Sequence, residues 1–113
     1  MTPRHKGSCH CGAIQLTLLE NPAAMTECNC SLCRRIGGLW HSCAPDAVEV
    51  TGACDGYIQG DRTLTNWRCR TCGCTTHWTP VDPDYGRMAI NLRMFDPELR
   101  AGLPINQIDG ASW

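Results

Sequence analysis

Three cysteines within six residues, Cys28, Cys30 and Cys33, constrain this chain more than any other feature. Thiolates with this spacing can surround one soft metal ion from a single tight turn. A structural zinc site normally has four protein ligands, whereas a reactive zinc keeps one position open. The spacing therefore predicts a metal-binding turn and leaves two alternatives. The turn is either a reactive site with an open position or a second structural site closed by Cys43, Cys54, Cys74 or a histidine.

The chain has 10 cysteines in 113 residues, which raises the question of its redox compartment. Residues 1–7 are polar and lack the apolar segment of a signal peptide, so we expect a cytoplasmic protein. In a reducing compartment, clustered thiols bind metal or react. A disulfide framework is the alternative, but a Cys-x-Cys pair makes a strained disulfide and an ordinary pair of metal ligands.

Length and charge restrict the class of protein further. We expect a single domain over residues 1–113, with residues 1–6 as a flexible tail. Lys and Arg total 10 and Asp and Glu total 11, so no basic excess points to a nucleic acid or an anionic membrane surface. The longest apolar runs are far too short to span a bilayer. We therefore expect neither a nucleic acid nor a membrane as a partner.

Short alternating segments between glycines and prolines predict a mainly β fold. In the earliest of them, Ile14, Leu16 and Leu18 alternate with polar residues. Strands are expected over residues 13–19, 39–44, 47–51, 63–68, 75–79, 87–93 and 105–108. One helical turn is expected over 31–35, capped by Ser31 and stopped by Gly37 and Gly38, and a short turn or helix over 96–99.

Two further cysteine pairs, Cys9-x-Cys11 and Cys69-x-x-Cys72, lie far apart in the sequence. Together they offer four thiolates, which is a closed tetrahedral set for structural zinc. Such a site would join an early strand to the middle of the chain. Structural zinc binding is itself folding free energy, on the order of 10 kcal/mol or more in zinc-finger peptides. We therefore predict that this site stabilises the fold.

The remaining cysteines and histidines receive simpler interpretations. Cys43 is expected as a small core residue, Cys54 as a loop or edge residue, and Cys74 as an alternative ligand beside a pair that already fills that role. His10 and His77 are expected beside ligands or at the surface, and the side chain of His41 could face the reactive site. Three aromatic residues are expected as core or groove walls: Tyr57, Trp67 and Trp78.

The order of these motifs is similar to that of a known family. A Gly-x-Cys-x-Cys-Gly segment at Cys9 and Cys11 is followed by Cys-x-Cys-x-x-Cys-Arg-Arg-x-Gly and then by Cys-x-x-Cys-Gly. A strand with Asn91, Leu92 and Arg93 follows, and the chain closes on Asp-Gly-x-x-Trp, from Asp109 to Trp113. This order resembles the glutathione-dependent formaldehyde-activating enzyme family, also called the centromere-protein-V/GFA domain. The resemblance covers nearly the whole chain.

The resemblance implies a fold, two zinc sites and a reaction. The implied fold is an Mss4-like β-tent of several small antiparallel sheets, stabilised by zinc. The structural zinc of the family matches Cys9, Cys11, Cys69 and Cys72, and the catalytic zinc matches Cys28, Cys30 and Cys33. The implied reaction joins glutathione, or another thiol, to formaldehyde or a small aldehyde. The product is S-hydroxymethylglutathione, and the reverse reaction makes the enzyme a carbon–sulfur lyase.

Three functional hypotheses follow. The principal one is a zinc-dependent carbon–sulfur lyase, in which cationic residues bind the carboxylates of glutathione; Arg34, Arg35, Arg68 and Arg93 are candidates by charge. The second is a zinc-stabilised binding module without turnover. The third is a redox sensor in which Cys28, Cys30 and Cys33 release metal on oxidation.

Overall fold

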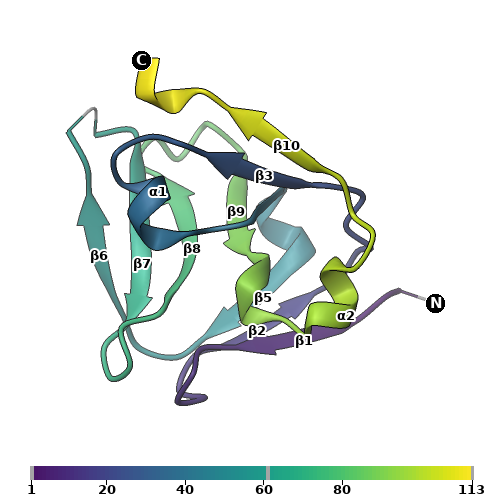
Figure 1. Ribbon diagram of the computed structural model, residues 1–113. Helices are drawn as coiled ribbons and strands as arrows, with labels where there is room; N and C mark the ends of the chain where they lie inside the picture. Colours follow the sequence, from purple (N-terminus) through teal and green to yellow (C-terminus); the bar gives the residue numbers. More distant parts are fainter. Residues whose placement is uncertain (1, 61, 113) are drawn as a thin grey trace.

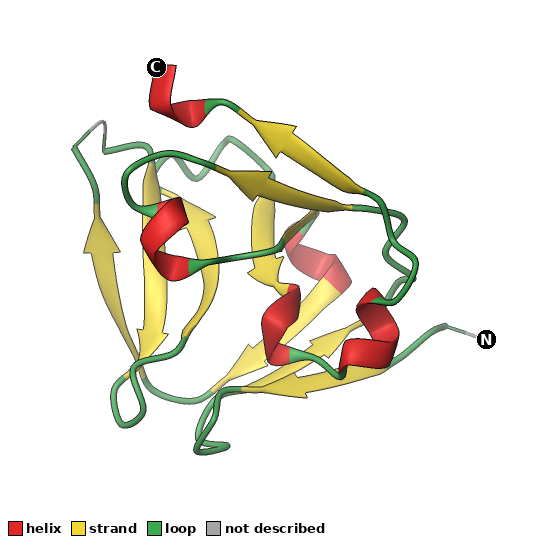
Figure 2. Ribbon diagram, viewed as in Figure 1, coloured by secondary structure: helices red, strands yellow, loops and turns green. Residues whose placement is uncertain are grey.

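Strands make up most of the regular structure of the computed structural model, which describes residues 2–60 and 62–112. The described residues form ten strands: β1 (His5–Ser8), β2 (Gln15–Leu18), β3 (Met25–Cys28), β4 (Trp40–Cys43), β5 (Val48–Thr51), β6 (Cys54–Ile58), β7 (Leu64–Cys69), β8 (Thr75–Pro80), β9 (Met88–Asn91) and β10 (Ile105–Ile108). They also form the one-turn helices α1 (Cys33–Ile36) and α2 (Pro97–Arg100) and the 3₁₀ turns η1 (Pro45–Ala47), η2 (Leu92–Met94) and η3 (Gly110–Ser112) (Figure 2). The predicted mainly β class is confirmed.

The strands are arranged in two sheets (Figure 1). The smaller sheet has the order β1-β2-β5, and the larger has the order β10-β3-β4-β9-β8-β7-β6. All pairings are antiparallel except that of β10 with β3, which is parallel. The parallel pair departs from the antiparallel sheets that the resemblance implied. A parallel pair needs a long connection between its strands, and residues 29–104 supply it between β3 and β10.

The core lies between the two sheets. Leu16 and Leu18 of β2 are fully buried and belong to the same cluster as Cys43 of β4 and Met88 and Ile90 of β9. Successive side chains of a strand point to opposite faces, so the neighbours of these residues in β4 and β9 point away from the core. That outer face of the larger sheet is available for a binding site.

β6 was not expected from the sequence, because its segment was interpreted as a turn at Gly52 and Gly56. Two further strands were also not expected. β1 begins inside the segment predicted to be a flexible tail: His5 and Lys6 pair with Leu18 and Thr17. β3 occupies the segment that was interpreted only as leading into Cys28. Both strands are rich in polar residues and lack the period-two alternation of a half-buried strand, so the sequence pattern carried no signal for them.

The ends of the short helices follow local chemistry. The helical turn predicted before Gly37 is present as α1, and Gly37 ends it with a φ of 69°. The predicted cap is wrong, because the N-cap is Leu32 and not Ser31. α2 is the short helix expected after Asp96, whose side chain accepts a hydrogen bond from the Glu98 N–H at 2.9 Å. Within the described part of the chain, no helix is long and apolar enough to cross a membrane.

The expected strand over residues 87–93 is shorter in the structure. β9 ends at Asn91, and Leu92–Met94 form η2. The Asn91 side chain causes this change of conformation, since its oxygen accepts hydrogen bonds from the backbone N–H groups of both Arg93 and Leu39, at 3.2 Å each. An asparagine that can cap a turn competes with continuation of the strand.

Candidate active site and metal centres

Four sulfurs converge where the two sheets meet, and we call this group the tetrathiolate site. The Sγ atoms of Cys9, Cys11, Cys69 and Cys72 all lie within 4.8 Å of one another. The Cys11 sulfur lies 3.7 Å from that of Cys9 and 3.6 Å from that of Cys69. Ligands at 2.3 Å around a tetrahedral zinc would lie about 3.8 Å apart. The donor set and its spacing therefore fit a zinc ion.

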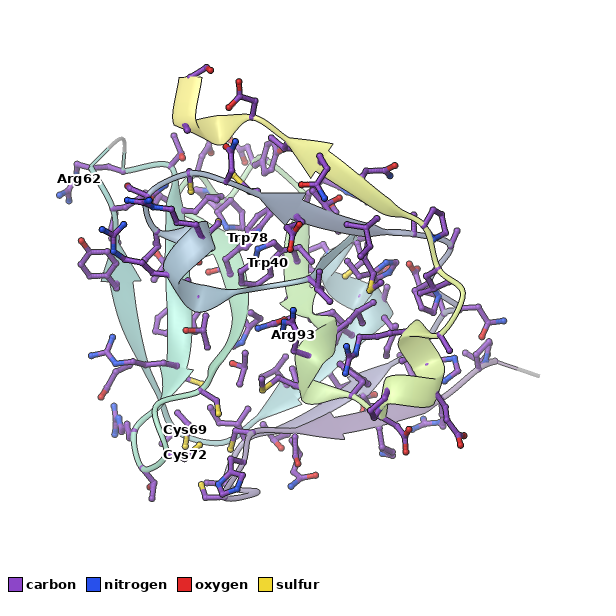
Figure 3. The ribbon with its side chains drawn as sticks, viewed as in Figure 1. Trp40, Arg62, Cys69, Cys72, Trp78 and Arg93 are labelled. Atoms are coloured by element: carbon purple, nitrogen blue, oxygen red, sulfur yellow. The ribbon has the colours of Figure 1, made fainter. Side chains whose placement is uncertain are left out.

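The local backbone prepares these sulfurs to be thiolates. Cys9 accepts a hydrogen bond from the Ile14 N–H, and Cys69 accepts one from the Thr71 N–H, each at 3.3 Å. Gly73 adopts a φ of 80°, which lets the turn between β7 and β8 fold back beneath its two cysteines. Figure 3 shows Cys69 and Cys72 at the lower end of the larger sheet, beside the smaller one. The site therefore connects elements that lie far apart in the sequence.

Two thiols of the tetrathiolate site, those of Cys69 and Cys72, have lowered pKa values, whereas for Cys11 a backbone N–H lowers the pKa but the neighbouring thiols raise it overall, to about 11. The backbone N–H groups of Cys74 and Cys11 lower the pKa of the Cys72 thiol to about 5. The N–H groups of Cys72 and Thr71 lower the pKa of Cys69. Hydrogen bonds to the charged form favour the thiolate, and the thiolate is the form that binds metal.

Three cysteines remain outside both clusters of the described chain. Cys43 is 1% exposed and lies in the core, as predicted. Cys54 begins the edge strand β6, as predicted, and pairs with Cys69 across the sheet. Cys74 follows the tetrathiolate site without joining its four sulfurs.

The second cluster, which we call the triad, comprises Cys28, Cys30 and Cys33. Cys28 ends β3, Cys33 begins α1, and the three sulfurs lie within 4.8 Å of one another. The Cys30 N–H donates to the Cys28 sulfur at 3.4 Å, and the Cys33 N–H donates to the Cys30 sulfur at 3.3 Å. No fourth Cys, His, Asp or Glu of residues 2–60 and 62–112 joins this group. The sulfurs therefore fit three of the four positions around a zinc ion.

The triad sulfurs differ in acidity. Burial acts to raise the pKa of Cys30, but the N–H of Cys33 and the sulfurs of Cys33 and Cys28 lower it overall. Burial raises the pKa of Cys33, and the negative charge of Cys30 adds to the effect. The thiolate form is thus favoured at Cys30 and disfavoured at Cys33, and the thiolate is the form that binds a cation.

The triad opens into a cavity of about 1580 Å³ on the outer face of the larger sheet. Alternate residues of the strands line it, which follows from the period-two geometry of a strand. They include Trp40 and Ser42 of β4, Ala89 of β9, Trp78 of β8 and Tyr57 of β6. Of the two alternatives for the aromatic residues, core or groove walls, the cavity shows the second for Tyr57 and Trp78, whereas Trp67 does not line it.

Three arginines line the same cavity: Arg34, Arg35 and Arg62. Of the four arginines predicted by charge, Arg34 and Arg35 are therefore at the cavity, whereas Arg68 and Arg93 do not line it. The Arg93 side chain instead donates a hydrogen bond to the Gly37 carbonyl. Arg62 lies at the tip between β6 and β7 (Figure 3). The sequence offered no signal for Arg62, because only the folding of that tip brings it to the cavity.

Trp40 carries a polar atom that the fold leaves unsatisfied. The residue is 4% exposed, and its indole N–H has no acceptor in the described structure. Leaving a buried donor unpaired costs free energy, about 1–3 kcal/mol. No motif in the sequence marks Trp40 as a site residue.

Both buried histidines lie away from the cavity. His41 does not line it, which corrects the expectation that it could face the reactive site; its Nε2 atom lies 2.8 Å from the Glu20 carboxylate. The reason is strand alternation, since the neighbouring Trp40 takes the cavity face. His77 is also buried, stacks on Trp67 at a ring distance of 6.3 Å and contacts the Thr76 hydroxyl at 2.8 Å. Burial lowers the pKa of His77 to about 4.

The C-terminal motif also lies at the triad. Ile108, Gly110 and Ala111 line the cavity beside Cys28 and Cys30. Asp109 accepts hydrogen bonds from the side chains of Ser112 and Asn29, which lower its pKa. Trp113, the last residue of the motif, lies outside the described residues.

The chain is similar to known proteins in both sequence and structure. The sequence model of the glutathione-dependent formaldehyde-activating enzyme family matches residues 4–107. A solved structure of a Rhodobacter sphaeroides protein, a structural genomics target, is similar with a TM-score of 0.72 and 33% sequence identity. The match covers 89% of this chain and 99% of the other. The comparison with curated proteins gave no match.

Proposed function

Because the chain belongs to the glutathione-dependent formaldehyde-activating enzyme family, we propose that it is a carbon–sulfur lyase that forms and cleaves thiol adducts of a small aldehyde. The proposed thiol is glutathione or a related thiol, and the proposed aldehyde is formaldehyde or a close relative. One observation carries the proposal: the three sulfurs of the triad converge at the wall of a large open cavity without a fourth ligand from the described chain. Reactive metal sites keep such an open position.

The proposed reaction needs few catalytic groups. The thiol sulfur adds to the carbonyl carbon, and the proton of the thiol moves to the carbonyl oxygen, so no oxidant or reductant is required. Zinc held by Cys28, Cys30 and Cys33 would, at its one open position, either keep a bound thiol deprotonated or polarise a carbonyl. Holding the two reactants close together supplies much of the remaining acceleration.

The residues around the triad have complementary roles in this proposal. Arg34 and Arg62 would bind the carboxylates of glutathione, since guanidinium groups pair with carboxylates through charge-assisted hydrogen bonds. Trp40 and Trp78 would form an apolar wall that keeps water from the reacting atoms. The cavity has room for a tripeptide as well as an aldehyde.

The test is a measurement of adduct formation with zinc-loaded protein. The exchange between formaldehyde and S-hydroxymethylglutathione is followed by NMR with ¹³C-labelled formaldehyde, and the buffer rate is subtracted. We expect acceleration by the native chain and none by Cys30→Ala. Cys54→Ser is the matched control, because it removes a half-buried thiol that belongs to neither cluster. A native chain with both sites loaded that does not exceed the buffer rate would contradict the proposal.

A binding module is the alternative that one observation favours. Tyr57 and Tyr85 line the cavity and are 54% and 59% exposed, as in surfaces that hold a ligand through aromatic contact. Under this alternative, calorimetry would detect glutathione binding while the NMR exchange rate stays at the buffer value.

The redox-sensor alternative predicts that peroxide releases zinc from the triad before it releases zinc from the tetrathiolate site.

A further inference from the structure

The segment Asp109–Ser112, which we call the C-terminal turn, contacts the triad directly. Gly110 is the single buried residue between Pro104 and Ser112. A Cβ atom added to Gly110 would lie 2.6 Å from the Cys28 sulfur and 3.1 Å from the Cys30 Cβ. The φ of Gly110 is not in the left-handed region, so the glycine is needed for space and not for backbone conformation.

Asn29, between Cys28 and Cys30, holds the C-terminal turn in this place. Its side-chain nitrogen donates to the Asp109 carboxylate at 3.0 Å, and its side-chain oxygen accepts from the Ala111 N–H at 2.9 Å. Its backbone N–H donates to the Ile108 carbonyl at 3.2 Å. These three hydrogen bonds lie on both sides of Gly110 and fix its backbone against the two cysteines.

Among residues 2–60 and 62–112, the C-terminal turn has few contacts other than those with Asn29 and the triad. The parallel ladder between β10 and β3 ends at the pair of Ile108 and Cys28, so the turn lies beyond it. The side chains of β10 are all exposed, with Ile105 46% and Ile108 36% accessible. A segment with few buried apolar contacts opens easily, and its position then depends on its hydrogen bonds.

We propose that Asn29 is a positioning residue of the triad: it fastens the C-terminal turn across Cys28 and Cys30, and thereby orients two of the three sulfurs and closes one side of the metal site. This inference rests on the proposed function in one respect, namely that the triad is a metal site. Its consequence is that access to the triad runs through the cavity. Substitution of the outer partners of metal ligands typically weakens metal affinity by about 10–100-fold, and we expect the same for Asn29→Ala.

The matched control is Gln107→Ala. The Gln107 side chain donates to the Glu27 carboxylate at 2.9 Å, so this variant also removes a hydrogen bond between β10 and β3. Neither of these two residues lines the cavity or belongs to the triad. The two variants therefore separate a role at the triad from general support of the strand pair.

The experiment has two readouts. In the first, zinc-loaded proteins are titrated with a colorimetric chelator. We expect Asn29→Ala to release the more weakly held of its two zinc ions at about 10–100-fold lower chelator concentration, whereas Gln107→Ala behaves like the native chain. Equal release curves for Asn29→Ala and Gln107→Ala would overturn the inference.

The second readout is the rate at which iodoacetamide alkylates Cys28 and Cys30 in metal-free triads, mapped by mass spectrometry. We expect several-fold faster alkylation in Asn29→Ala than in Gln107→Ala, with unchanged rates at Cys43. If Cys28 and Cys30 are alkylated at the same rates in Asn29→Ala and in Gln107→Ala, the role of Asn29 is contradicted. This readout needs neither metal nor turnover, so a native chain that fails to accelerate the aldehyde reaction would count against the proposed function alone.

Discussion

The tetrathiolate site takes its ligands from two segments, residues 9–11 and 69–72, whereas the triad takes all of its ligands from residues 28–33. The first site joins the turn between β1 and β2 to the turn between β7 and β8, and so connects the two sheets. The second site lies at the end of β3 and the beginning of α1 and opens into a cavity. Both clusters thus use cysteine sulfurs as donors, but they differ in the distance along the chain that separates their ligands.

This difference determines what a metal ion bound at each cluster would do. A metal that joins distant segments removes conformational freedom from a long loop of the unfolded chain, so its binding energy becomes folding energy. A metal held within six residues restrains almost nothing beyond that turn. It is therefore free to lose a ligand, accept a substrate or dissociate without unfolding the protein.

The largest expected effect comes from breaking the tetrathiolate site. Cys72→Ser should unfold the chain, because the lost zinc energy, on the order of 10 kcal/mol, is comparable to the whole stability of a small domain. Far-ultraviolet circular dichroism and zinc content measure the outcome. Cys74→Ser is the control, since Cys74 lies beside the site without joining it. A folded Cys72→Ser with two zinc ions would disprove the structural role.

The triad should respond in the opposite way. Cys30→Ala is expected to stay folded with one zinc ion and to lose all acceleration of the aldehyde exchange, because the remaining two sulfurs hold the metal poorly. Circular dichroism, metal content and the NMR exchange rate are measured on the same sample. If this variant unfolds as Cys72→Ser does, both clusters are needed for folding, and the proposed difference between them is wrong.

Acid will weaken both metal sites, and His77 adds an effect that is separate from them. Its pKa is about 4 in the folded chain, below the usual value near 6.5, so the unfolded chain binds a proton more readily. The contribution of His77 to the free energy of unfolding is therefore fully present above pH 6.5. It is lost as the pH falls toward 4, by on the order of 3 kcal/mol. The free energy of unfolding, measured by chemical denaturation between pH 7 and pH 4.5, should decline less steeply for His77→Gln than for the native chain. Parallel curves would rule out this contribution.

The smallest effect is expected from the arginines at the cavity. Arg34→Gln and Arg62→Gln should each raise the KM for glutathione by about tenfold or less, since one exposed charge-assisted hydrogen bond contributes about 1.5 kcal/mol. The value of kcat should change little, because the carboxylates are remote from the reacting atoms. Arg68→Gln, which does not line the cavity, should leave the KM unchanged. An equal rise for all three variants would point to net charge instead of a specific contact.

The parts of the site that the sequence predicted are those defined by short spacing. Cys28, Cys30 and Cys33 are close in the chain, and a tight turn brings such residues together in almost any fold. Cys69 and Cys72 follow the same rule, and the stop at Gly37 needs only the left-handed conformation that glycine allows. Pairing these two cysteines with Cys9 and Cys11 required one further argument, that two half-sites complete a tetrahedron.

The parts that the sequence missed depend on register and on distant segments. Whether His41 or Trp40 faces the cavity depends on which face of β4 meets the core, and a shift of one residue would exchange them. Arg62 reaches the cavity only because β6 and β7 form the far edge of the larger sheet. Neither fact can be predicted from the local composition of the sequence.

The sequence by itself determined the donor atoms, their grouping into two sets and the mainly β class, since these follow from spacing and alternation. The tertiary structure alone decided that one set joins the two sheets while the other opens into a cavity. It also decided that Gly110 lies against Cys28, although more than eighty residues separate them. The physical reason is that covalent spacing limits what neighbouring residues can do, whereas sheet order and register arise only when the whole chain packs its core.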